Sequence, residues 1–147
     1  MNELLKTARQ YNVTICLENQ PFLNFSLSRP TDILRFVKTI NDDNFKICFD
    51  TGHVSVFKDL SVGEELRKLG DEIRVLHVHD NAFDIDLHLM PFFGIIDWHD
   101  FAAALNEIRF GGSFSLETLP SRKLPTAIFE DMCKSLVKIS QEIVYDI

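Results

Sequence analysis

Apolar and polar positions follow two periods along this chain of 147 residues, and the two periods alternate. Apolar residues at helical spacing, three or four apart, predict helices over residues 1–11, 32–41, 61–69, 97–108 and 125–145. Apolar, β-branched runs between them predict strands over residues 13–19, 45–53, 73–81 and 112–118. The chain therefore begins with a helix and then repeats a strand–helix unit.

Alternation of strands and helices with short connections is typical of a parallel α/β sheet. The predicted strands are almost wholly apolar, as expected where both faces of a sheet are covered. Thr31 and Asp97 are expected to cap helix N-termini, and Gly70 to close a helix. No glycine-rich phosphate-binding fingerprint follows any strand, which argues against a nucleotide-binding fold.

Composition narrows the function classes. Hydrophobic residues make up 46% and charged residues 25%, which predicts one globular domain over residues 1–147. The net charge of −7, without a basic patch, argues against nucleic acid as a partner. No apolar run predicts a membrane partner or a signal peptide, and three unpaired cysteines favour a cytoplasmic location.

Each predicted strand ends on a side chain that can bind a metal ion. These side chains are Glu18, Asp50, His79 and Glu117, spaced by about one strand–helix unit. In a parallel sheet they would meet at one edge, where three carboxylates would repel each other unless a cation lay between them. Mixed carboxylate and imidazole ligands suit Mn²⁺, Co²⁺, Mg²⁺ or Zn²⁺.

Single residues of this kind have simpler explanations. A carboxylate at a strand end is often a solvated loop residue or a helix cap, and a lone histidine on a strand is often a core residue. His53, His77 and His88 are further candidates. Alternation places His77 on the same strand face as His79, so one could bind a metal while the other orients a neighbouring group.

Five segments carry a resemblance to a known family. "ICLENQP", "ICFDTGH", "LHVHDN", "DIDLHLMPFFGIIDWHDF" and "FSLET" resemble the xylose-isomerase-like (β/α) barrel superfamily in order and spacing. This superfamily includes sugar-phosphate isomerases and epimerases, ketose 3-epimerases, inosose dehydratases and endonuclease IV-type enzymes. The resemblance implies a parallel (β/α) barrel of the TIM type.

The resemblance also implies roles for single residues. The shared metal ligands would be Glu18, Asp50, His79 and Glu117. His53 resembles a substrate-contacting residue of the epimerases and a zinc ligand of the endonucleases. Asp86 and His88 resemble the endonuclease pair that holds a further zinc ion, so His53, Asp86 and His88 form a candidate second site.

Family members have eight strands, whereas this sequence predicts four, which resemble the last four. The chain is therefore expected to form about four C-terminal βα units, with the N-terminal half of the barrel missing. Four strands leave two unpaired sheet edges, and unpaired edges associate readily. A homo-oligomer that completes the barrel is one expectation.

The function that the resemblance implies is that of a divalent-metal-dependent isomerase or epimerase of a small sugar or sugar phosphate, in carbohydrate metabolism. Glu18 and Glu117 would move a proton through a metal-stabilised enediolate, and His53 would contact the substrate. One alternative is an endonuclease IV-like zinc phosphodiesterase acting on abasic DNA. Another is a truncated remnant without catalytic activity.

Overall fold

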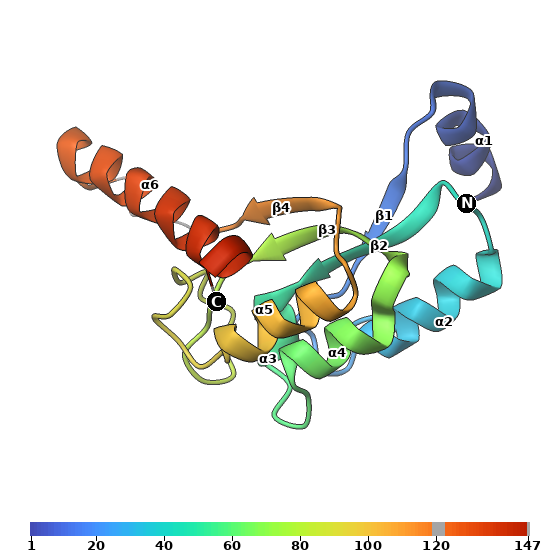
Figure 1. Cartoon of the computed structure of the whole chain (residues 1–147). Helices are drawn as coiled ribbons and strands as arrows, with labels where there is room; N and C mark the ends of the chain where they lie inside the picture. Colours follow the sequence, from blue (N-terminus) through green and yellow to red (C-terminus); the bar gives the residue numbers. More distant parts are fainter. Residues whose placement is uncertain (119–122, 147) are drawn as a thin grey trace.

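Four parallel strands form the centre of the molecule (Figure 1). The structure is a computed structural model and describes residues 1–118 and 123–146. The strands form one sheet in the order β1-β2-β3-β4, so each pairs with the next along the chain. This arrangement confirms the predicted parallel α/β sheet. The strands are β1 (Ile15–Glu18), β2 (Phe45–Asp50), β3 (Ile73–Val78) and β4 (Ser113–Leu116).

Helices connect the strands, as the periodicity predicts. A short 3₁₀ turn, η1, precedes β3, and a π-helical turn, η2, follows the last helix. Among the described residues, no helix is both long enough and apolar enough to cross a lipid bilayer. The helical elements are α1 (Asn2–Tyr11), α2 (Pro30–Ile40), α3 (Thr51–Ser55), α4 (Val62–Leu69), η1 (Gly70–Glu72), α5 (Trp98–Glu107), α6 (Thr126–Gln141) and η2 (Glu142–Asp146).

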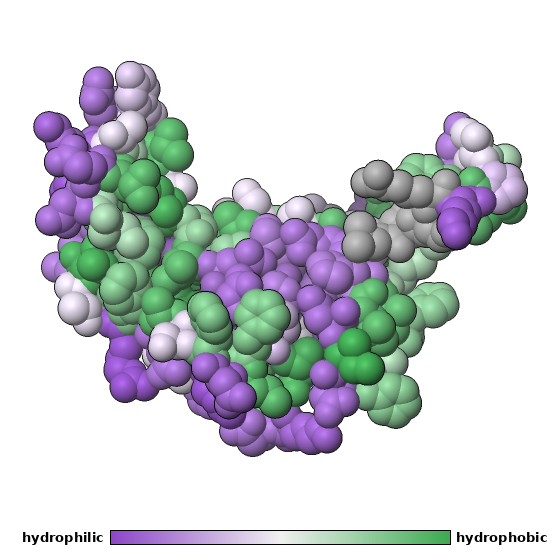
Figure 2. Space-filling model, turned by 180° about the vertical axis from the view of Figure 1, so that it is seen from behind, coloured by the Kyte–Doolittle hydropathy of each residue, from purple (hydrophilic) through white to green (hydrophobic). Residues whose placement is uncertain are grey.

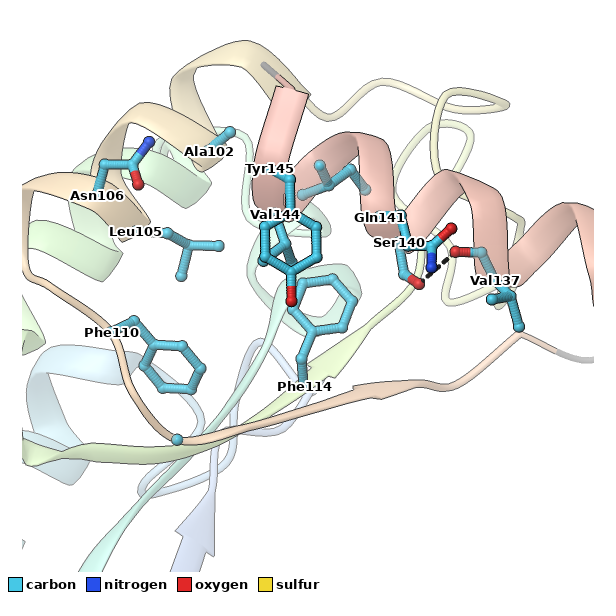
Figure 3. Close-up of a pocket in the computed structure, with 12 residues that line it drawn as sticks. Ala102, Leu105, Asn106, Phe110, Phe114, Val137, Ser140, Gln141, Val144 and Tyr145 are labelled. Carbon is cyan, nitrogen blue, oxygen red and sulfur yellow. Dashed lines mark hydrogen bonds between the residues drawn. The ribbon is translucent and has the colours of Figure 1, made fainter.

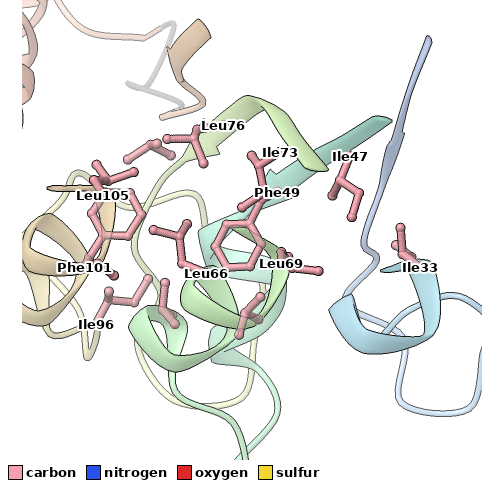
Figure 4. Packing of buried hydrophobic residues seen from close by; sticks show 14 of the residues in the cluster. Ile33, Ile47, Phe49, Leu66, Leu69, Ile73, Leu76, Ile96, Phe101 and Leu105 are labelled. Carbon is pink, nitrogen blue, oxygen red and sulfur yellow. The ribbon is translucent and has the colours of Figure 1, made fainter. Parts of the chain in front are cut away.

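One face of the sheet forms the hydrophobic core (Figure 4). Ile47 and Phe49 project from β2 onto this face, where α2, α4 and α5 cover them. Leu66 of α4 and Phe101 of α5 are fully buried in the same cluster. Because these side chains fill the space between sheet and helices, they fix the positions at which the strands end.

The other face of the sheet is open. Figure 2 shows this side as a hollow between two projecting ends, with hydrophilic surface near its middle. The ends are formed by α1 and α6, as Figure 1 shows. Within the described residues, β1 pairs only with β2 and β4 only with β3, so both sheet edges lack a partner strand. The fold is therefore an open half-barrel rather than a closed one.

Most predicted boundaries hold to within two or three residues. Asp97 caps α5, and Gly70 follows α4 with a φ of 53°. The prediction that Thr31 caps a helix is wrong, because α2 begins at Pro30 and its N-cap is Arg29. Proline is favoured in the first turn of a helix, where its missing N–H is not needed.

Candidate metal centre

Four side chains converge above the C-terminal ends of the strands. We call Glu18, Asp50, His77 and Glu117 cluster A, since each offers a ligand atom within 4.8 Å of the others. Nδ1 of His77 lies 2.8 Å from Oε1 of Glu18 and 3.2 Å from Oε1 of Glu117. The strand register explains why His77 joins the carboxylates. His77 pairs with Asp50 across β2 and β3, so the two side chains point to the same face of the sheet.

The donor set of cluster A fits a divalent cation. Three carboxylates meet one imidazole, and such a set suits hard and borderline metal ions. Asp50 is fully buried, and its Oδ2 atom has no hydrogen-bond partner. A buried carboxylate oxygen without a partner is costly, and a bound cation would satisfy it. The cluster could therefore hold a metal ion.

A second group of potential ligands lies beside the first. We call His53, His79, Asp86 and His88 cluster B, whose ligand atoms also lie within 4.8 Å of one another. Oδ2 of Asp86 is 3.4 Å from Nε2 of both His53 and His88. The rings of His79 and His88 are stacked with their centroids 4.1 Å apart. The sequence places Asp86 and His88 on the long loop between β3 and α5.

Backbone carbonyl groups fix the tautomers of two of these histidines. Nδ1 of His53 lies 2.7 Å from the carbonyl oxygen of Asn19, and Nδ1 of His88 lies 2.7 Å from that of Glu117. A carbonyl oxygen only accepts hydrogen bonds, so both Nδ1 atoms carry the hydrogen. The Nε2 atoms of both rings then face Asp86, at 3.4 Å from its Oδ2. Metal-binding histidines are commonly oriented by such carbonyl groups.

Asp50 and His79 connect the two clusters. Nε2 of His79 lies 3.0 Å from Oδ1 of Asp50, close enough for an ion pair although the ring N–H is not aligned for a hydrogen bond. Burial alone would raise the pKa of Asp50, but His79 and, after it, His53 together outweigh the burial and lower that pKa. Burial would lower the pKa of His79, yet Asp50 raises it on balance. Asp50 therefore favours its negatively charged form, and His79 favours its positively charged form.

The predicted ligands divide between the two clusters. Glu18, Asp50 and Glu117 come together as expected, but the histidine that joins them is His77, and His79 belongs to cluster B. The reason is that β3 ends at Val78, so strand alternation no longer determines the direction of His79. Its ring instead packs over Gly52, where a Cβ atom would lie 1.9 Å from a ring carbon. Which histidine binds a metal stays a prediction.

Two buried asparagines were not among the predicted site residues. The side chain of Asn19 accepts a hydrogen bond from the N–H of Asp50 and donates one to its carbonyl oxygen, at 2.8 and 3.0 Å. Asn81 accepts from the N–H of Leu87 and donates to the carbonyl oxygen of Gly52. Each asparagine directly follows an acidic residue: Glu18, the last residue of β1, precedes Asn19, and Asp80, two residues beyond the end of β3, precedes Asn81. That position was the only signal available in the sequence.

A separate pocket lies away from both clusters (Figure 3). It has a volume of about 430 Å³ and is lined mainly by residues of α5, β4, the end of α6 and η2. Phe114 and Tyr145 face it, as do Leu105 and Val144. None of its lining residues belongs to cluster A or B. The chemistry of the strand ends is therefore independent of this pocket.

Residues 1–138 match the xylose isomerase-like TIM barrel family over most of the chain. The chain belongs to this family. The match confirms the family and the barrel type that the five sequence segments predict. In TIM barrels, active sites lie at the C-terminal ends of the strands, which is where cluster A lies.

Curated relatives include both uncharacterised proteins and sugar epimerases. An uncharacterised protein of Methanocaldococcus jannaschii is 33% identical over 119 residues, which are 80% of this chain and 41% of that protein. A D-psicose 3-epimerase of Ruminiclostridium cellulolyticum is 29% identical over 118 residues, which are 80% of this chain and 38% of that protein. The chain thus spans about two-fifths of the length of these relatives.

Among solved structures, a D-tagatose 3-epimerase-like protein is similar with a TM-score of 0.73 and 31% identity. The similarity covers 97% of this chain and 54% of that one. The four strands of this chain therefore correspond to about half of a related barrel, in agreement with the open sheet face.

Proposed function

We propose that this chain carries the metal-binding part of a sugar isomerase or epimerase. The observation that carries the proposal is cluster A, in which one ligand from or directly after each of the four strands meets at the C-terminal edge of the sheet. The epimerase names of relatives and of a similar structure support a small sugar as the substrate class, and the proposal extends to a sugar phosphate.

Within this proposal, Glu18, Asp50, His77 and Glu117 hold one divalent cation, Mn²⁺, Co²⁺, Mg²⁺ or Zn²⁺. Such a cation would polarise the carbonyl group of an open-chain ketose as a Lewis acid. His79 remains the alternative imidazole ligand, since its Nε2 lies 3.0 Å from Asp50. We favour His77 because it contacts both glutamates of the cluster.

Glu18 and Glu117 are suited to move the proton. Their side chains are 30% and 36% exposed, so a substrate in the hollow of the half-barrel can reach them. One carboxylate would remove a proton from the carbon beside the carbonyl group, and the other would return it. His53 lies at the edge of cluster A, with its Nδ1 3.9 Å from Oε1 of Glu18, and would contact a substrate oxygen.

A complete sugar pocket requires a second half-barrel. The unpaired edges of β1 and β4 can each accept a parallel strand, and α6 buries only Leu136 among its described residues. A second copy of the chain could supply the missing strands, and so could a further segment of the same protein. Closure by either would cover the exposed apolar residues of α6, such as Ile128 and Val137.

Cluster B favours a second candidate, an endonuclease IV-like phosphodiesterase. His53, Asp86 and His88 would hold a further zinc ion there, with both Nε2 atoms facing Asp86. The net charge of −7 argues against a DNA partner, because phosphate contacts need positive side chains. Retardation of abasic DNA at low salt, together with its cleavage, would favour this candidate over the isomerase.

The test is solvent proton exchange with bound metal. The chain is loaded with Mn²⁺ or Co²⁺ and incubated in D₂O with D-psicose or D-tagatose, and deuterium at the carbon beside the carbonyl is measured by NMR. Exchange that needs the metal supports the proposal. Stoichiometric metal binding without exchange would contradict the catalytic assignment for the chain by itself. Absence of metal binding would favour a catalytically inactive remnant.

A further inference from the structure

The two sides of cluster B come from separate parts of the chain. His53 belongs to the short helix α3, directly after β2, whereas Asp86 and His88 belong to the loop between β3 and α5. Loops depend on tertiary contacts for a defined shape. Nε2 of His53 can stay 3.4 Å from Oδ2 of Asp86 only if the loop is held against α3.

Asn81 makes this connection. Its Nδ2 donates to the carbonyl oxygen of Gly52, next to His53, at 2.8 Å and to Oγ of Ser55 at 3.2 Å. Its Oδ1 accepts from the N–H of Leu87 at 2.6 Å. Asn81 is fully buried, and its amide is bonded on both the oxygen and the nitrogen side. A buried amide with satisfied bonds fixes its neighbours in one arrangement.

The contact with Leu87 falls between the two loop ligands. Leu87 separates Asp86 from His88, and the backbone of Leu89 is bonded in both directions to that of Asp80 at 2.8 Å. His88 itself has a φ of 51°, which is unusual for a residue other than glycine. Such a conformation persists only when the surrounding structure holds it. The bonds on both sides of His88 provide that restraint.

Asp80 binds the last part of the same loop, just before α5. Its buried carboxylate accepts from the N–H groups of Gly94, Ile95 and Ile96 and from Nε1 of Trp98, at 2.9 to 3.2 Å. These contacts fix the end of the loop, away from cluster B. The side chain of Asn81, by contrast, bonds to both α3 and the segment between the two ligands.

We propose that Asn81 is the positioning residue of cluster B, because its amide ties the loop that carries Asp86 to the helix that carries His53. Its amide acts through the backbone of Gly52 and of Leu87 and is not itself a member of cluster B. Asn19 provides an internal comparison, since it holds the backbone of Asp50 and belongs to the cluster A side. The inference rests on the proposed function only where a metal ion is used as a probe.

The first experiment needs no metal. Long-range ¹H–¹⁵N NMR of the imidazole groups at about pH 8, above the ordinary pKa of histidine, reports which ring nitrogen carries the hydrogen. The unchanged chain should show Nδ1–H for both His53 and His88. Asn81→Ala should abolish the fixed tautomer of His88 and leave that of His53. Asn19→Ala should instead disturb the tautomer of His53 before that of His88.

The second experiment uses Co²⁺ as the probe. Where Co²⁺ occupies cluster B as well as cluster A, bound cobalt should fall from about two ions per chain to about one in Asn81→Ala, with loss of the cluster B absorption bands. Asn81→Asp keeps the acceptor for Leu87 but loses both donors, and should weaken the second ion without unfolding the chain. Asp97→Ala is the matched control, because it removes the N-cap of α5 and so tests destabilisation alone.

The outcomes separate the two ideas. If the unchanged chain binds no Co²⁺, the proposed function fails, and the imidazole spectra still decide the role of Asn81. If Asn81→Ala and Asn81→Asp leave the His88 tautomer unchanged, the inference is overturned. It is also overturned if Asp97→Ala produces the same loss, because destabilisation would then be a sufficient cause.

Discussion

Nδ1 of His77 lies 2.8 Å from Oε1 of Glu18, although the two residues belong to strands separated by β2. The two side chains meet above the C-terminal ends of the strands, where the fully buried Asp50 completes the same cluster. This contact makes His77 the imidazole of cluster A.

We therefore predict that His77→Asn abolishes the first metal site. Affinity for Mn²⁺ should fall by more than about 100-fold, since even residues outside the ligand set typically contribute 10- to 100-fold. Isothermal titration gives the affinity, and elemental analysis gives the stoichiometry. His99→Gln is the control, because His99 is exposed on α5. Loss of this site in His79→Asn, but not in His77→Asn, would show that His79 is the ligand.

Glu117→Gln tests proton transfer. The amide is close in size to the carboxylate, so the fold should persist while exchange at the substrate carbon falls by about 10²- to 10⁴-fold. Deuterium uptake from D₂O into D-psicose measures this rate. Glu107→Gln is a matched control on α5, where Glu107 pairs with Arg67 at the surface. Exchange retained in Glu117→Gln would remove the assignment of Glu117.

Gly52→Ala should damage cluster B through packing alone. Alanine ordinarily stabilises a helix relative to glycine. At position 52, however, its Cβ would lie 1.9 Å from Cε1 of His79. The ring of His79 is fully buried and must move, so we expect a loss of about 1 to 3 kcal/mol in the free energy of unfolding. Urea denaturation measures it. Gly111→Ala is the control, because no atom lies within 4 Å of the added Cβ. Equal stability of the two variants would contradict this packing.

The sheet could be predicted from the sequence because its signals are local. Apolar runs and turn residues determine where strands such as β2 begin, and alternation of strands with helices indicates parallel pairing. Caps were predicted where a side chain bonds its own helix, as for Asp97. The cap at Thr31 was wrong because Pro30 starts the helix one residue earlier.

The candidate site was less accessible to sequence reasoning. Glu18, Asp50 and Glu117 could be predicted because each lies at or one residue beyond a strand end. The choice between His77 and His79 could not, since it depends on where β3 ends to within one residue. The role of Asn81 depends on contacts with Gly52 and Leu87, which no local pattern encodes.

Glu72 should make the stability of the chain dependent on acid pH. Its carboxylate accepts hydrogen bonds from Lys38 and Lys46 at 2.6 and 2.7 Å. Burial would raise the pKa of Glu72, but the two lysines outweigh it and lower that pKa below its ordinary value of 4.5. A lowered pKa stabilises the folded state above the unfolded pKa, and this contribution is lost as pH falls through the folded pKa.

Glu72→Gln should therefore cost about 2 kcal/mol at pH 7 and should flatten the loss of stability below about pH 4.5. Urea unfolding at a series of pH values measures both effects. Glu130→Gln serves as the control, because Glu130 is exposed on α6. If Glu72→Gln and the unchanged chain lose stability in parallel on acidification, the lysine contacts do not lower the pKa of Glu72. The acid sensitivity would then come from the other buried carboxylates, with Asp50 beside His79 the first to examine.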